Sequence, residues 1–420
     1  MATPVVDAAA CARHGDAKVL ELELAATRDR TLAMLAAWRA QLGDALTVDY
    51  DETCNPLRWE LGHIGWFEEW WLARNRERLH GDRADPDAPR AASIQPHADR
   101  WYDSGRVEHR SRWTLDLPEV DRIVDDIALQ RESTLALLRT SGPSDDALYF
   151  FRLALLHEDM HDEAWLMMAQ QLGIAPGDAI VEGESAADGA FDDGDALHVE
   201  AGEIELGETA PSGFAFDNEV GTRRVTLEAF TIDANVVSWR RFLAFVDAGG
   251  YAESHWWSPE GWAWRASSAA EHPRYLRRTR DGRWEQQRFD AWTDLDPNDA
   301  ASHLTWHEAQ AWCRWAGRAL PTEAQWRAAQ RRHGASAPHR RATFRWGEAW
   351  EWTATRFDGF EGFRAHPYRD YSQPWFDGRP VLKGASRWTH PHLHDPAYRN
   401  FFLPHRNDVH AGFRSVAPSV

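Results

Sequence analysis

Residues 147–172 read ALYFFRLALLHEDMHDEAWLMMAQQL, and this stretch decides the first half of the fold. Its apolar side chains recur at helical spacing and no glycine or proline interrupts them, so it predicts one long helix. Within it, His157 and His161 are four residues apart and therefore share one face of the helix, at a separation that a single metal ion can bridge. The stretch thus predicts a helix that carries a candidate metal site.

Three further stretches predict helices that pack beside this one: residues 20–42, a segment that starts after Asn55-Pro56, and residues 118–140. The second of these has one face made of Trp59, His63, Trp66 and Trp70. Because that face is apolar apart from the histidine, we expect His63 to point into the core, where it is available as a third ligand. Residues 80–117 form one long connection. Four helices with one long connection predict a four-helix bundle.

The second half of the chain has a different residue pattern from the first half. Residues 173–196 are rich in Gly, Asp, Glu and Ala, which indicates an acidic linker between a bundle at 17–172 and a second domain at 197–417. Beyond the linker, short alternating runs at 198–206 and 224–232 predict strands, and two helices are expected near 238–248 and 305–318. Most of the 24 tryptophans lie here, which favours a loop-rich α+β domain pinned by large side chains.

The composition and charge of the chain disfavour some classes of binding partner. The chain has 420 residues, with 66 acidic against 47 basic side chains and a formal net charge of -19, which disfavours nucleic acid and anionic membranes as partners. No run of 18 apolar residues and no secretory signal is visible, and the three cysteines are far apart, so we expect a cytoplasmic protein without disulfides. A small-molecule substrate is the remaining expectation.

The spacing of His157 and His161 alone has more than one interpretation. The pair could be polar residues on a partly solvated bundle face, or, with Glu158, the HExxH motif of a zinc peptidase. We disfavour the peptidase because this helix belongs to a bundle and the third candidate ligand lies upstream. The other two HxxxH pairs lack helical geometry, since His303/His307 spans a predicted strand-to-helix junction and His390/His394 contains a proline.

The motifs together resemble a known family. WELGH at 59–63 and HEDMHDE at 157–163 resemble the bundle domain of the ergothioneine-type nonheme iron sulfoxide synthases. The second half resembles the formylglycine-generating-enzyme fold fused to that bundle, through HLTW at 303–306, residues 312–326, WEWT at 350–353 and AGFR at 411–414. The resemblance covers about residues 17–417. It implies a DinB-like four-helix bundle followed by a loop-rich, C-type-lectin-like domain.

The resemblance also implies a reaction and a set of site residues. His63, His157 and His161 would bind Fe(2+), and the enzyme would use O2 to form a C–S or C–Se bond at the imidazole C2 of hercynine, the trimethylated betaine of histidine. Asn400 and Phe401 match the positions that contact hercynine. The other residues expected in the substrate site are Met160, Phe363, His366, Phe402 and Arg406.

Departures from the family pattern bear on the donor and on the proton source. Met160 stands where many members have Gln, and Phe363 stands where some have a catalytic tyrosine, which leaves Tyr102, Tyr368 and Tyr371 as candidates. The connection lacks the arginine pair that binds γ-glutamylcysteine, which favours the selenoneine synthase branch and its selenosugar donor. The alternatives are a sulfoxide synthase that uses γ-glutamylcysteine or cysteine, a metal-dependent thiol transferase, and a catalytically inactive binding module. A formylglycine-generating oxidase is disfavoured because the second half contains only Cys313.

Overall fold

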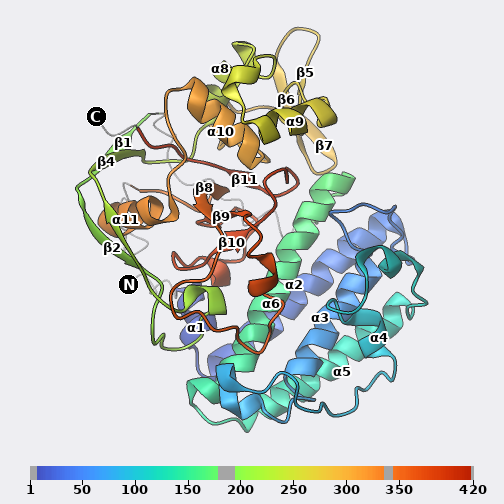
Figure 1. Cartoon of the computed structure of the whole chain (residues 1–420). Helices are drawn as coiled ribbons and strands as arrows, with labels where there is room; N and C mark the ends of the chain where they lie inside the picture. The colour runs from blue at the N-terminus through green and yellow to red at the C-terminus, as the bar shows by residue number, and fades with distance from the viewer. Residues whose placement is uncertain (1–6, 178–193, 335–343, 418–420) are drawn as a thin grey trace, which may run out of the picture.

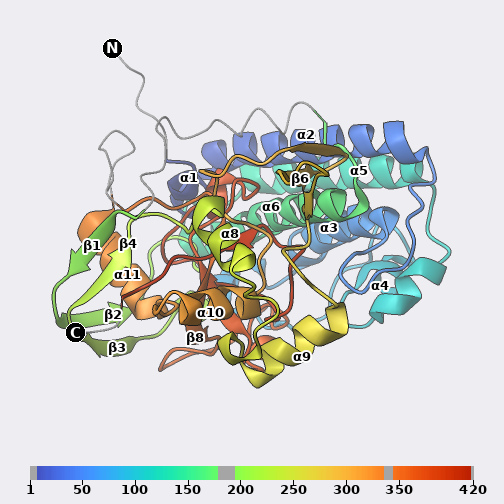
Figure 2. The ribbon, with the colours of Figure 1, turned by 90° about the horizontal axis from the view of Figure 1, so that it is seen from above.

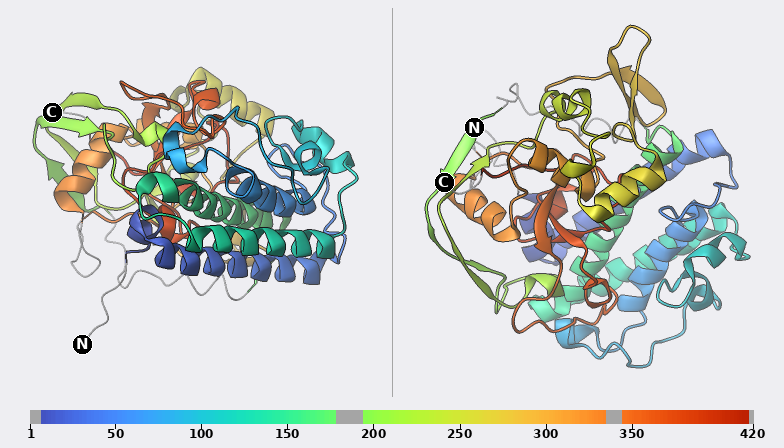
Figure 3. Two further views of the ribbon diagram at one scale, coloured as in Figure 1. Left: turned by 90° about the horizontal axis from the view of Figure 1, so that it is seen from below. Right: turned by 45° about the horizontal axis from the view of Figure 1, so that its top comes forward.

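The computed structural model describes residues 7–177, 194–334 and 344–417, and it has a helical half beside a half of short strands and loops (Figure 1). The long helix α6 (Asp145–Leu172) lies between the other bundle helices and the second half, as the views in Figures 1 and 3 both show. The predicted fold class is therefore confirmed. Most of the predicted acidic linker, residues 178–193, lies outside the described residues.

The first half is built from four long helices, which lie side by side in Figure 2. These are α2 (Ala17–Leu42), α3 (Leu57–Trp71), α5 (Val120–Arg139) and α6. The α2 helix begins three residues before the predicted start because Asp16 caps it, accepting from the backbone N–H groups of Lys18 and Val19. A short helix that the sequence analysis missed, α1 (Ala8–His14), precedes it.

A buried network of four charges ties the bundle helices together. Arg28 on α2 and Arg131 on α5 each bind both Glu68 on α3 and Glu158 on α6, at N–O distances of 2.5 to 2.9 Å. Although burial alone would raise the pKa of Glu158, the two guanidinium groups bring it down to about 2. Each helix thus contributes one charge to the interior.

The predicted long connection between α3 and α5 contains three short helical turns: η1 (Arg78–Arg83), α4 (Ala98–Tyr102) and η2 (His109–Thr114). It is held against α3, since Asp99 accepts from the indole N–H of Trp66 at 2.8 Å and from Arg74 at 2.7 Å. This contact places the backbone of α4 beside the candidate metal ligand His63.

In the second half, each of the two predicted strand runs is split in two. The first gives β1 (Ala196–Val199) and β2 (Gly202–Leu206), and the second gives β3 (Arg223–Leu227) and β4 (Phe230–Asp233). The antiparallel pairs β1–β4 and β2–β3 keep one register, with Val199 opposite Phe230 and Gly202 opposite Leu227. The predicted runs are therefore one long ribbon whose pairing is interrupted in the middle.

The core of this half is a four-stranded sheet in the order β10-β9-β8-β11, formed by Asn400–Phe401, Pro380–Lys383, Trp350–Arg356 and Ala411–Gly412. A separate meander consists of β5 (Leu276–Arg278), β6 (Trp284–Arg288) and β7 (Ala291–Asp294). Around them lie α8 (Trp239–Asp247), α9 (Pro259–Ser268), α10 (Trp306–Trp315) and α11 (Glu323–His333).

Tryptophan side chains hold the loops of this half in place. Trp352 is fully buried on β8, and its indole N–H donates to the carbonyl of Leu304 at 2.7 Å. Trp306 donates in the same way to the carbonyl of Thr353 at 2.9 Å. Such bonds satisfy buried backbone oxygens and fix neighbouring segments to one another, a use that suits the abundance of tryptophan.

Candidate active site

Three histidines from two helices meet at one point inside the molecule. His63 on α3 and His157 and His161 on α6 each offer a ring nitrogen, and these three atoms all lie within 4.8 Å of one another. The Nε2 atoms of His157 and His161 are 3.2 Å apart. Since the side chain of His161 is about one-fifth exposed while the other two are buried, the cluster opens toward solvent on the His161 side.

Hydrogen bonds fix how two of these imidazoles present their nitrogens. The Nδ1 atom of His63 lies 2.7 Å from the backbone carbonyl of Tyr102, and Nδ1 of His161 lies 2.5 Å from a carboxylate oxygen of Glu60. A carbonyl and a carboxylate can only accept, so both Nδ1 atoms carry hydrogen and both Nε2 atoms keep a free lone pair. This outer arrangement is typical of metal-binding histidines.

The electrostatics of the cluster keep His63 and His157 neutral. Burial, reinforced by the neighbouring His161, lowers the pKa of His63 to about 3, and burial also lowers the pKa of His157 well below its ordinary value. The rings of Phe67 and Trp59 stack on His157 and His63, with centroids 3.5 and 4.7 Å apart. Three converging imidazoles, two of them buried, fit a divalent first-row transition metal that keeps open positions for other ligands.

A cavity of about 640 Å³ lies against His157 and His161, and both halves of the chain form its walls. It contains seven of the residues predicted for the substrate site or as proton donors: Met160, Tyr368, Tyr371, Asn400, Phe401, Phe402 and Arg406. The first belongs to α6 and the others to the second half. The fold therefore brings the histidine cluster and the segment around Asn400 to one cavity.

Three predicted site residues do not line this cavity. The phenol of Tyr102 is buried against α3, where a Cβ atom at Gly62 would lie 2.2 Å from its ring, and only its backbone carbonyl reaches the cluster. Phe363 packs edge-on to Phe376, with ring centroids 5.1 Å apart. His366 is buried and bonds the hydroxyl of Tyr149 at 3.0 Å. All three are held by packing or hydrogen bonds away from the cavity.

A pair of tyrosines faces the sulfur of Met160. The hydroxyl of Tyr371 donates to that of Tyr398 at 3.1 Å, and the sulfur of Met160 lies 3.4 Å from the Tyr398 hydroxyl. Burial raises the pKa of both phenols above the ordinary value, so both are protonated at neutral pH. The sequence analysis missed Tyr398, although it lies two residues before Asn400, a residue predicted to contact the substrate.

The two arginines of the cavity wall are already engaged. Arg112 donates to the side-chain oxygen of Asn55 at 2.8 Å, and its guanidinium lies 3.9 Å from the centroid of the Trp59 ring. Arg406 forms two hydrogen bonds with Asp408. Among the described residues that line the cavity, therefore, Arg406 is the arginine already paired with a carboxylate, whereas Arg112 bonds neutral oxygens and its buried Nε–H has no hydrogen-bond partner.

Two of the acidic neighbours of the histidines on α6, Glu158 and Glu163, have separate roles. Glu158 is bound by Arg28 and Arg131 in the bundle interior, so it is not available to activate water as the HExxH motif would require. Glu163 lines the cavity and accepts from the indole of Trp350 at 2.7 Å, and also from the hydroxyls of Ser386 and Thr389. Glu163 thus joins α6 to the second half beside the metal ligands.

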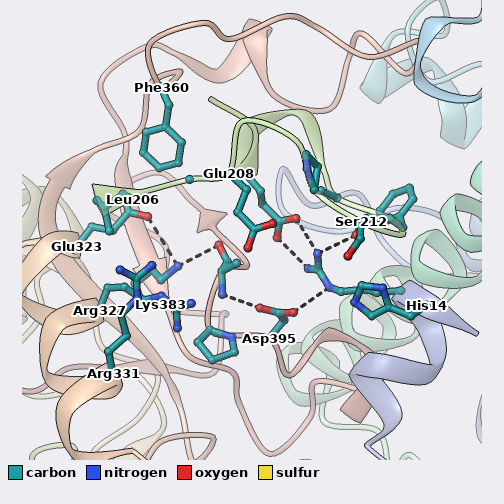
Figure 4. Close-up of a pocket in the computed structure, with 18 residues that line it drawn as sticks. His14, Leu206, Glu208, Ser212, Glu323, Arg327, Arg331, Phe360, Lys383 and Asp395 are labelled. Atoms are coloured by element: carbon teal, nitrogen blue, oxygen red, sulfur yellow. Dashed lines mark hydrogen bonds and ion pairs between the residues drawn. The ribbon is translucent and has the colours of Figure 1, made fainter. Parts of the chain in front are cut away.

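A second cavity, of about 300 Å³, is shown in Figure 4. It shares no lining residue with the first cavity. Its charged groups are largely paired with one another: Arg13 binds Glu219 at 2.8 Å and Asp395 at 3.2 Å, while Lys383 donates to the carbonyl of Tyr398 at 2.6 Å. None of the three clustered histidines lines it. We therefore assign the candidate reaction site to the larger cavity.

Within the described residues, no helix has the length and apolar character needed to cross a bilayer. Residues 182–349 match the family model described as the sulfatase-modifying factor enzyme 1-like domain. A formylglycine-generating enzyme of Streptomyces coelicolor is 33% identical, over 32% of this chain and 46% of that protein.

Two relatives match nearly the whole chain. The hercynine oxygenase of Mycolicibacterium smegmatis is 30% identical over 93% of this chain and 97% of its own length. That of Mycobacterium tuberculosis is 29% identical over 94% of this chain and 97% of its own length. Because the similarity runs through both halves, including the helices that carry the histidines, the chain belongs to the hercynine oxygenase family, a family of oxidoreductases.

Proposed function

We propose that the protein is a cytoplasmic, iron(II)- and O2-dependent enzyme that joins selenium or sulfur to the imidazole C2 of hercynine, with a selenosugar as the favoured donor. In the balanced reaction, one O2, the C2–H group and one selenol give a selenoxide and one water. The observation that carries the proposal is the single cavity against which His157, Tyr371 and Asn400 all lie, together with the family of the chain.

The residues that would hold the iron(II) are His63, His157 and His161, because one ring nitrogen of each converges on the same point. Among the described residues, this group of candidate ligands contains no carboxylate. Iron(II), when bound, supplies the redox chemistry with O2 that amino-acid side chains lack. The protein's own part is to keep His63 and His157 neutral, to fix the tautomers of His161 and His63 through Glu60 and the Tyr102 carbonyl, and to exclude water with Phe67 and Trp59.

The substrate side of the cavity suits a trimethylated, zwitterionic imidazole. The aromatic faces of Phe401 and Phe402 can surround a quaternary ammonium group, which they attract through the ring quadrupole. The side chain of Asn400 offers a donor and an acceptor for the carboxylate or the imidazole. Bound in this way, the substrate would place its ring between the segment at 400–402 and the histidine cluster.

Tyr371 is the proposed proton donor in place of the residue at position 363. Its hydroxyl faces the cavity, it is held by Tyr398, and its raised pKa keeps the proton on Oη at neutral pH. Tyr398 would orient that proton by accepting the hydrogen bond, and it could return a proton after the transfer. This pair supplies the function that Phe363 cannot perform.

The donor preference rests on the number of arginines open to a carboxylate. A donor with two carboxylates, such as γ-glutamylcysteine, needs two cationic partners, whereas Arg406 is already paired with Asp408 and leaves Arg112 as the other arginine on the wall. A neutral, hydroxylated donor makes no such demand and could bond the polar groups of Asp370 and Ser104 on the wall. Losing a buried charged contact typically costs about 2 to 5 kcal/mol, so the preference should exceed tenfold in kcat/KM.

The experiment that tests the proposal is anaerobic loading with iron(II), followed by O2, hercynine and one donor at a time: a sugar-linked selenol, cysteine or γ-glutamylcysteine. Mass analysis should detect a C2-substituted hercynine selenoxide with the selenosugar. A better kcat/KM with γ-glutamylcysteine would reject the donor but keep the reaction class. Hercynine binding without O2 consumption, with every donor, would indicate a binding module instead.

A further inference from the structure

A second group of possible metal ligands lies on the other side of α6. Asp159 is two residues from both His157 and His161, so it points about 200° away from them around the helix. It lies near His392, which belongs to the short turn η6 (Pro391–Leu393) of the second half, and near His390, which directly precedes that turn. One ligand atom from each of the three lies within 4.8 Å of the other two.

The distances within this group limit how its hydrogen bonds can be arranged. Nδ1 of His392 is 2.8 Å from Asp159 Oδ2, while Nε2 of the same ring is 3.2 Å from a carboxylate oxygen of Glu23 on α2. A neutral imidazole can donate to only one of two carboxylates. One carboxylate next to a neutral ring therefore lacks a donor, and a cation bound by both Nδ1 and Asp159 would remove this conflict while Nε2–H donates to Glu23.

The surroundings match the outer shell of a metal site. Glu23 would orient His392 from behind, as carboxylates commonly do for ligating histidines. Asp159 is held by the hydroxyl of Thr27 and by Arg30, both acting on Oδ1, so Oδ2 remains directed at His392. Asp159 and His392 are almost fully buried, whereas the side chain of His390 is about one-quarter exposed and gives an ion a way in.

The charges around Asp159, His390 and His392 also favour a bound cation. Asp159 and Asp162 share Arg30, and Glu23 adds a further carboxylate next to His392. Asp159 and Glu23 are thus two carboxylates on either side of His392, and Arg30 is the guanidinium bound to Asp159. A divalent ion bound there would balance the remaining negative charge.

We propose that Asp159, His390 and His392 form a second metal site, which takes zinc or a similar divalent transition metal and fastens the second half of the chain onto α6. Two imidazole nitrogens and one carboxylate oxygen are ligands that zinc prefers, and one water would complete a tetrahedron. The site is structural, because it faces away from the cavity and none of its three ligands lines it. It does not depend on the proposed reaction.

The test uses the full-length His157→Ala/His161→Ala protein, in which the first histidine cluster cannot hold a metal. After chelation, cobalt(II) is added as the probe, because tetrahedral cobalt has strong visible absorption bands. We expect one equivalent of cobalt per chain, those bands, and a higher Tm. Adding His390→Ala or His392→Ala should weaken cobalt binding at least tenfold and remove both the bands and the rise in Tm.

The matched control is His394→Ala, on the same segment, because His394 bonds the Thr389 carbonyl and is not part of the group. This variant should bind cobalt as the parent does. The far-ultraviolet circular dichroism of each metal-free variant checks that it is folded. Absence of cobalt from the folded parent would overturn the proposal. Unchanged cobalt binding in the folded His390→Ala and His392→Ala proteins would overturn it as well.

Discussion

A carboxylate oxygen of Glu60 on α3 lies 2.5 Å from Nδ1 of His161 on α6, so a residue of one helix sets how a residue of another presents its imidazole. The same carboxylate accepts from Asn55, which in turn binds Arg112. Burial would raise the pKa of Glu60, but His161, His63 and Asn55 together bring that pKa down to about 2. Glu60 therefore stays ionised and holds the His161 tautomer throughout the neutral range.

Glu60→Gln should weaken metal binding without unfolding the protein. An amide can present its NH2 group to Nδ1 and so allow the tautomer that hides the Nε2 lone pair, and loss of such an outer contact typically costs about 10- to 100-fold in metal affinity. The measurement is an iron(II) titration. Glu69→Gln is the matched control, because Glu69 is equally buried on α3 but binds Ser93 and the Ile94 backbone instead. Equal losses in both variants would contradict the role of Glu60.

His63→Ala should abolish stoichiometric iron binding together with turnover, because it removes one of three converging nitrogens. Metal analysis of the reconstituted protein measures the first and hercynine consumption the second. His80→Ala, at an exposed position on η1 that pairs with Glu77, should retain both. An iron-loaded and active His63→Ala protein would place the metal elsewhere.

Tyr371→Phe should lower kcat by about 10² to 10⁴, the range expected for loss of a general acid, while hercynine KM changes little. Tyr398→Phe should have a smaller effect, because it removes only the acceptor that orients the proton. Tyr102→Phe serves as the control, since its ring lies outside the cavity. If Tyr102→Phe is the most impaired of the three, the assignment of the proton donor is wrong.

His303→Asn should make the protein less sensitive to acid. Burial lowers the pKa of His303 to about 3, so the unfolded chain binds a proton more readily and stability falls as the pH drops below the unfolded value near 6.5. Between about pH 7.5 and about pH 5, His303 should therefore account for a loss of about 2 kcal/mol. Asparagine tolerates the left-handed backbone at this position, where φ is 57°. Urea unfolding at both pH values measures the difference, and an unchanged difference would contradict the prediction.

Separately expressed halves, residues 1–172 and 197–420, should each be inactive. The metal ligands belong to the first and Tyr371, Asn400 and Phe401 to the second, so neither contains the whole cavity. Activity is measured with iron(II), O2, hercynine and each donor. Turnover by the first half alone would favour a metal-dependent thiol transferase over the proposed oxidative reaction.

The sequence predicts those parts of the fold that depend on local periodicity. The start of α3 follows from Pro56, and the course of α6 follows from its uninterrupted apolar pattern, although α6 begins at Asp145, two residues before the predicted stretch. The i, i+4 spacing is enough to pair His157 with His161. The inward direction of His63 also follows, because its helix has an apolar face. These features need no knowledge of distant contacts.

What could not be predicted depends on contacts between segments far apart in the chain. The role of Glu60 requires α3 to lie against α6, and Tyr398 becomes part of the site only because Tyr371 reaches it across the second half. Phe363 and His366 sit within a run that resembles the family, yet Phe376 and Tyr149 hold them elsewhere. Motif position indicates the neighbourhood of a side chain, whereas packing decides its direction.

The four-charge network of Arg28, Glu68, Arg131 and Glu158 limits how this chain can be recombined with its relatives. Each helix supplies one member, so a chimera that exchanges a single helix for one with a neutral side chain would leave an uncompensated charge inside the bundle. Removing one partner of such a pair typically costs about 3 to 5 kcal/mol. Crossover points for engineering should therefore fall outside the bundle, which should be transferred whole.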